Sequence, residues 1–221
     1  MAFRIFNNLV SNSAQRYLGA NNNRLSQVFA RISSGIRIQK GSEDSASMAT
    51  SEALKADART LRQGVRNIND GLSMLNVADG AIAEQTSIVS RMRELAMQSA
   101  TGTIGSTERQ TVNLEFRAIR SELDRIAKTT EFNGLKILSG ALSSSASEKI
   151  VLQLGLNSND MNRINMNRDV NITPTTAANL ELNILSIGNK ESARLAVENI
   201  KQITQKLTDV RARLGANQSR L

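Results

Sequence analysis

The sequence predicts a mainly α-helical protein: a long antiparallel coiled-coil-like rod with a small β region, plus an N-terminal amphipathic helix. The only proline, Pro174, leaves long stretches without a helix-breaking residue. Aromatic residues make up only 3% of a chain that is 40% hydrophobic, so the core must consist mostly of aliphatic side chains. Apolar residues also recur at alternating steps of three and four, the heptad spacing of helices that pack along their length.

Residues 1–42 form the predicted N-terminal helix. Apolar residues such as Phe6, Val10, Tyr17 and Ile32 follow a helical stripe with Asn and Arg between them, so one face needs a partner. The segment has no Asp or Glu, and its cations are Arg4, Arg16, Arg24, Arg31, Arg37 and Lys40. A basic arm of this kind is compatible with nucleic-acid binding, membrane association, targeting such as a mitochondrial transit peptide, or self-assembly.

Residues 43–140 are predicted to form two rod helices and a turn. Glu43 and Asp44 place negative charge in the first turn of a long helix, where the helix dipole favours it. A Gly/Thr/Ser loop at residues 101–106 separates this helix from a second one, so the two should fold back antiparallel. The core residues expected in them are Leu61, Val65, Ile68, Leu72, Leu75, Ile119 and Leu123.

Residues 141–190 are predicted to be a short β region, because apolar and polar residues alternate there. The alternation runs from Ile150 to Leu156 and, more strictly, from Ile164 to Ile172. Residues 191–221 return to helical spacing as a C-terminal rod helix, with Asn217 on its apolar seam. Since no helix-stop signal follows, we expect this helix to be truncated. Its expected core residues are Ile203, Leu207 and Val210.

The composition argues against an enzyme, a cofactor or a metal site. Without Cys or His, the chain lacks a thiol nucleophile, an imidazole base and the usual zinc ligands. The pair Glu122/Asp124 fits a solvated helix face better than acid–base catalysis, and the Gly102/Gly105 loop lacks the Gly-Lys of a phosphate-binding loop. No segment reaches the roughly twenty apolar residues that a membrane span requires.

Four sequence blocks, in order, resemble the bacterial flagellins. They are ISSGIRI at 32–38 followed by EDSA at 43–46, NINDG at 67–71, RELAMQSA at 93–100, and EFNGLKIL at 131–138; LGANQSRL at 214–221 extends the likeness. The resemblance implies an extracellular filament subunit with the N-terminal helix in the filament's inner core. It also implies export through the flagellar secretion channel and addition beneath the filament cap. The variable outer domains are absent, and we expect the C-terminal end to be missing, so the chain resembles a minimal flagellin.

The resemblance also implies a recognition surface at Arg91, Leu95, Gln98 and Glu115, positions at which flagellins are contacted by Toll-like receptor 5. Packing between subunits is the simpler role for the same surface. The expected partners are other flagellin subunits, the flagellar export apparatus, the filament cap and an innate immune receptor. No nucleic-acid partner is expected. A hook–filament junction protein is the alternative within the same architecture, and a coiled-coil adaptor or nucleic-acid-binding module is the alternative from another class.

Overall fold

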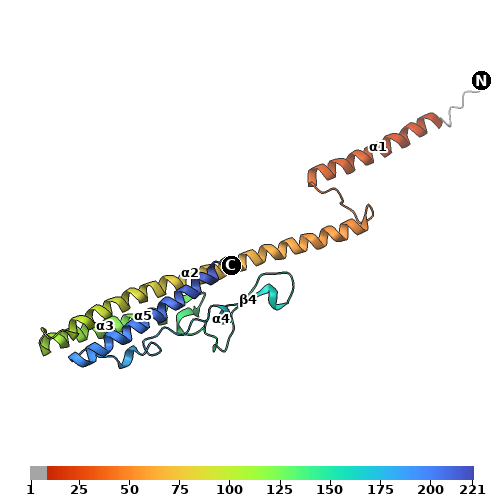
Figure 1. Ribbon diagram of the computed structural model, residues 1–221. Helices are drawn as coiled ribbons and strands as arrows, with labels where there is room; N and C mark the ends of the chain where they lie inside the picture. The colour runs from red at the N-terminus through yellow and green to blue at the C-terminus, as the bar shows by residue number, and fades with distance from the viewer. Residues whose placement is uncertain (1–8) are drawn as a thin grey trace, which may run out of the picture. The chain divides into compact units, whose positions relative to one another are not determined.

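The computed structural model describes residues 9–221 and is dominated by helices. The four long ones are α1 (Leu9–Ser34), α2 (Ser45–Ala100), α3 (Ser106–Thr129) and α5 (Lys190–Gln218) (Figure 1). The chain divides into two compact units, Met1–Arg59 and Thr60–Leu221. The predicted mainly α fold is confirmed, and each unit is described by itself.

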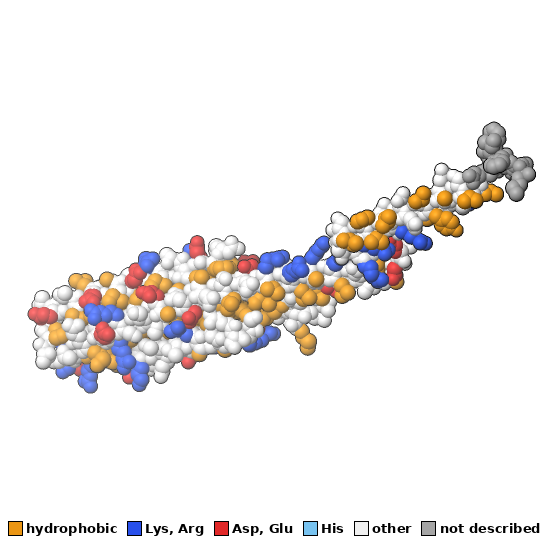
Figure 2. All heavy atoms as spheres, turned by 90° about the horizontal axis from the view of Figure 1, so that it is seen from above, with side chains coloured by type: hydrophobic (Ala, Val, Ile, Leu, Met, Phe, Trp, Pro, Cys, Tyr) orange, Lys and Arg blue, Asp and Glu red, His pale blue; other side chains and the backbone are white. Residues whose placement is uncertain are grey.

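The first unit contains α1 and the start of α2. Apolar side chains of α1 point into solvent, and Figure 2 shows them in orange along this helix. Tyr17 is 74% and Ile32 73% exposed, and no residue of the helix is buried. A connecting segment follows, in which Glu43 lies 3.1 Å from the Arg31 guanidinium. Asp44 then accepts a hydrogen bond from the Ser47 N–H at 3.0 Å, which caps the start of α2. The predicted Arg4 and Phe6 lie outside the described residues.

The second unit is the helical rod. α3 folds back along α2, and α5 also lies beside α2, as Figure 1 shows. Arg211 of α5 donates to Asp79 of α2 at 2.9 Å. The side chain of Gln218 donates to that of Asn76 at 3.1 Å. Because the numbers rise along α5 as they fall along α2, these two helices are antiparallel.

A single guanidinium closes the turn between α2 and α3. Arg109 donates to the carbonyl oxygens of Ser99, Thr101 and Ile104 at 2.8, 3.0 and 3.1 Å. The last carbonyl groups of a helix have no hydrogen-bond donor within that helix, and they form the negative end of its dipole. A cation from the next helix therefore donates hydrogen bonds to them and offsets this negative charge.

Two short antiparallel hairpins complete the second unit. β1 (Glu131–Phe132) pairs with β2 (Leu135–Lys136), and β3 (Val151–Gln153) pairs with β4 (Arg163–Asn165). The first turn uses Asn133 and Gly134 at φ of 49° and 80°, a left-handed pair that favours Asn-Gly. The rest of the segment contains the 3₁₀ turns η1 (Ile137–Ser139), η2 (Asp160–Asn162) and η3 (Leu182–Ile184) and the short helix α4 (Met166–Asp169).

The strand predicted from Ile164 to Ile172 is wrong beyond Asn165, where the chain enters α4. The side chain of Asn165 accepts from the Arg168 N–H at 3.2 Å and so caps this helical turn. Met166 and Val170 are both buried, and residues four apart lie on one helical face. The same apolar spacing therefore fits a helical turn as well as a strand.

The β3–β4 hairpin lies against α2 at two glycines. A Cβ added at Gly64 would overlap the carbonyl oxygen of Leu154, and one at Gly71 would overlap a methyl of Leu152. Between them, the Asn67 side-chain amide donates to the carbonyl oxygen of Gln153 at 2.9 Å. The absence of side chains at these glycines lets the hairpin approach the helix backbone closely.

The predicted seam is wrong at the N-terminal part of α2. Leu61 and Val65 are 48% and 57% exposed, and Ile68 and Leu72 are only half-buried. α5 covers only the part of α2 that follows this region. The hydrogen bond between α5 and α2 that lies nearest the N-terminal end of α2 is the one at Asn76. Heptad spacing defines an apolar face, whereas burial also requires an opposing helix.

The remaining expected core residues lie within the rod. Ile119 is half-buried, and its neighbours on α3, Phe116 and Leu123, are fully buried. The buried members of the expected set are Leu75, Leu123, Ile203, Leu207 and Val210.

Candidate protein-recognition surface

An exposed ion-pair network joins α2 to α3 at Arg91. Its guanidinium donates to Glu94 one turn along α2 and to Glu115 of α3, both at 3.0 Å. The hydrogen bond to Glu94 makes the larger contribution and the hydrogen bond to Glu115 the next; together they raise the pKa of Arg91 above its ordinary value. All three side chains are about half exposed, so water screens the pairs and they contribute little to stability.

The four expected site residues do not form one exposed surface. Gln98 is exposed and lies seven residues after Arg91, which places both on one face of α2. Leu95 is 1% exposed and packs in the core, so its assignment to the contact surface is wrong. Met92 and Leu95 continue the buried seam of α2, and this explains the inward direction of Leu95.

Glu94 also belongs to the surface, although the flagellin resemblance does not imply a role for it. The signal for it was the spacing of three residues from Arg91 on a helix, at which oppositely charged side chains meet. The exposed surface therefore consists of Arg91, Glu94, Gln98 and Glu115, and we call it the α2–α3 face. It presents charged groups held in place by one another, which suits protein recognition and supplies no catalytic group.

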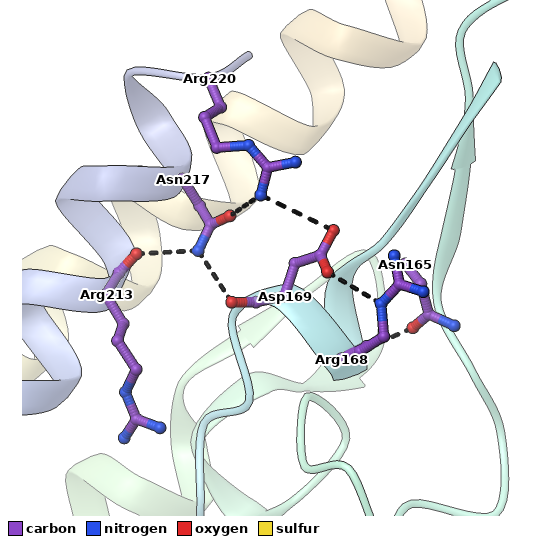
Figure 3. A network of polar contacts seen from close by, with 6 residues as sticks. All are labelled: Asn165, Arg168, Asp169, Arg213, Asn217 and Arg220. Carbon is purple, nitrogen blue, oxygen red and sulfur yellow. Dashed lines mark hydrogen bonds and ion pairs between the residues drawn. The ribbon is translucent and has the colours of Figure 1, made fainter. Parts of the chain in front are cut away.

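A second polar network fastens the irregular segment to the end of α5 (Figure 3). The Asn217 side-chain amide donates to the backbone carbonyls of Asp169 and Arg213, both at 2.9 Å. The Asp169 carboxylate accepts from Arg168 at 3.0 Å and lies 4.0 Å from Arg220. Asn217 is only 8% exposed, although it is the polar residue on the predicted apolar seam of α5. Its hydrogen bonds satisfy the buried amide and attach α4 to the end of α5; we call this contact the Asn217 clamp.

The described residues give no sign of a metal or membrane site. No group of three or more acidic residues within residues 9–221 is placed to hold a metal ion. Among the helices of this part of the chain, none combines the length and apolar character needed to cross a bilayer.

The family model described as "Bacterial flagellin N-terminal helical region" matches residues 5–143, more than half of the chain. The chain belongs to the bacterial flagellin family. It is 33% identical over 224 residues to the flagellar filament 30.7 kDa core protein of Treponema maltophilum, covering 98% of this chain and 77% of that protein. It is 42% identical over 161 residues to flagellin A of Vibrio cholerae, covering 70% of this chain and 42% of that protein.

Solved flagellin structures share the fold. The crystal structure of Bacillus cereus flagellin aligns with a TM-score of 0.57 at 25% identity, covering 70% of this chain and 84% of that one. A Burkholderia pseudomallei FliC structure aligns with a TM-score of 0.54 at 16% identity, a likeness of fold alone, covering 68% of this chain and 100% of that one. Family membership confirms the flagellin resemblance and identifies a structural, non-enzymatic component of the extracellular flagellar filament.

Proposed function

We propose that the chain polymerises with other copies through the apolar stripe of α1. The observation that carries the proposal is that this 26-residue helix has no buried residue. Val28 and Ile32 are 48% and 73% exposed on its stripe. A single helix gains little stability in water unless its apolar face is packed, and helices of neighbouring subunits are the partners proposed for this stripe.

Paired charge substitutions on α1 test this role. Ile32→Asp places a carboxylate on the stripe, whereas Gln27→Asp places the same charge off the stripe and is the matched control. Burying an unpaired carboxylate is costly, so we expect Ile32→Asp to abolish sedimentable filaments and Gln27→Asp to retain them. Filaments of normal yield from Ile32→Asp would contradict the proposal.

We further propose that the α2–α3 face is used for protein recognition, between subunits in the filament and by Toll-like receptor 5 in free monomers. Arg91 supports this because it holds acidic groups from two helices in a fixed, exposed arrangement. Arg91→Ala and Glu115→Ala should each weaken receptor signalling by purified monomer. Glu122→Ala, on the same α3 helix and paired with Arg125, should leave signalling unchanged. Unchanged signalling in both Arg91→Ala and Glu115→Ala would remove the receptor assignment.

Passage through the flagellar export apparatus and addition beneath the filament cap complete the proposed function, as the family resemblance implies. Cells that lack the flagellar secretion channel should retain the chain inside, whereas their complemented counterparts should release it into the medium. Equal release from both strains would show a different route.

A further inference from the structure

A hollow lies between α5 and the irregular segment, and its lining combines apolar and charged groups. It has a volume of about 480 Å³, and Leu180, Leu207 and Val210 form its apolar wall. Lys206 and Arg213 of α5 lie along it with Asp209 between them. We call this the α5 groove, and its two cations against one acid give it a net positive charge.

The charged groups of the α5 groove have no ion-pair partner within the described chain. Figure 3 shows the Arg213 guanidinium directed away from the Asn217 clamp, to which Arg213 contributes only its backbone carbonyl. Thr175 also belongs to the groove lining, but its hydroxyl is buried and has no hydrogen-bond partner in the described structure.

The loop between β3 and β4 has the complementary character. Met161 is 98% exposed and Leu156 is 44% exposed, although both belong to a short connection between paired strands. Asp160 precedes Met161, and its carboxylate makes no ion pair or hydrogen bond in the described structure. We call residues 155–162 the hairpin tip; it presents apolar side chains beside a free negative charge.

We propose that the hairpin tip of one copy docks in the α5 groove of another copy. Met161 and Leu156 contact the apolar wall, and Asp160 approaches Lys206 and Arg213. This inference rests on the proposed function, because it names one contact by which the subunits polymerise. An interface between two different patches of the same chain is heterologous, and repetition of such a contact builds rings or open helical filaments rather than two-fold dimers.

The spacing of tip and groove along the rod sets the stagger between the joined copies. The hairpin reaches α2 at Gly64, and the groove helix pairs with α2 at Asp79, fifteen residues further along. At 1.5 Å per helical residue this is about 22 Å. Copies in the same orientation that are joined by this contact are therefore displaced along the rod by about 22 Å or more, and a tip cannot reach its own groove.

Cysteine cross-linking tests the contact directly, because the chain has no cysteine of its own. The variant carries Met161→Cys at the tip and Asn179→Cys in the exposed groove lining. The control carries Met97→Cys, another exposed methionine, with Asn179→Cys. Disulfides need Cα atoms within about 7 Å, so oxidation of assembled chains should give a ladder of linked copies only for the Met161 variant.

Charge exchange provides a second readout that does not depend on cysteine. Asp160→Lys and Arg213→Glu should each lower filament elongation roughly threefold to tenfold, because each places like charges together. The double variant Asp160→Lys/Arg213→Glu should recover elongation.

The outcomes separate the contact from the proposed function. Normal filaments from the Met161→Cys/Asn179→Cys chain without a ladder would overturn the tip-to-groove contact and leave polymerisation standing. Elongation by both single charge variants at the rate of the unaltered chain would do the same. If the unaltered chain fails to enter flagellar filaments at all, the proposed function fails and the contact fails with it.

Discussion

Replacing Gly64 by Ala should loosen the hairpin that lies on α2. In most helix interiors this change is stabilising by roughly 0.5–1 kcal/mol, because Ala restricts the unfolded chain and Gly does not. At Gly64 the new Cβ would overlap the carbonyl oxygen of Leu154 and lie 3.2 Å from its carbonyl carbon. A backbone group cannot move aside as a side chain does, so the hairpin itself must shift.

Gly80→Ala is the matched control, since Gly80 lies in the same helix and a Cβ there meets nothing within 4 Å. The helix-propensity gain is common to both variants and cancels in their difference. That difference then reports the steric cost, which for overpacking is about 1–3 kcal/mol. We therefore expect Gly80→Ala to stabilise the rod and Gly64→Ala to be less stable than Gly80→Ala by that amount.

Urea unfolding followed by helical circular dichroism measures both free energies. Hydrogen exchange adds a local readout, because the Leu154 N–H donates to the Asn162 carbonyl at 2.9 Å in the docked hairpin. This amide should exchange faster in Gly64→Ala and unchanged in Gly80→Ala. Equal stabilisation by both substitutions, with unchanged exchange at Leu154, would refute the close docking of the hairpin on α2.

Three further predictions concern the rod and the start of α2. Leu75→Ala should destabilise the rod by about 2–5 kcal/mol as a buried large-to-small change, whereas Leu61→Ala should cost far less; equal costs in urea unfolding would contradict the burial difference. Arg109→Met, which removes three donors to carbonyls at the α2–α3 turn, should lower stability by roughly 1–3 kcal/mol and speed hydrogen exchange in that loop; unchanged values would argue against its role. Hydrogen bonds from Ser47 lower the pKa of Asp44 below 3.8, so the carboxylate stabilises the start of α2 above that pH and this stabilisation is lost on acidification. Nuclear magnetic resonance should show the start of α2 fraying at low pH, and Asp44→Asn should remove this pH dependence.

The positions of the long helices follow from the sequence because their signals are local. The predicted start near Glu43 and Asp44 agrees with an observed α2 that begins at Ser45, and the loop at residues 101–106 agrees with its end at Ala100. Capping groups, glycine loops and a three-four apolar period act within a few residues of the chain. The Asn133–Gly134 turn is equally local, and it forms the β1–β2 hairpin.

Burial and the route of the irregular segment were decided only by the tertiary structure. Leu61 and Leu75 occupy equivalent heptad positions, yet one is 48% exposed and the other fully buried, because α5 covers only the second. Leu95 was expected at a contact surface and lies in the core for the same reason: which face is covered depends on distant elements. Met166 and Val170 fit either a strand or a helical turn by spacing alone, and packing against the rod selected the turn. A local pattern fixes which residues share a face, whereas the elements that pack against that face determine what it contacts.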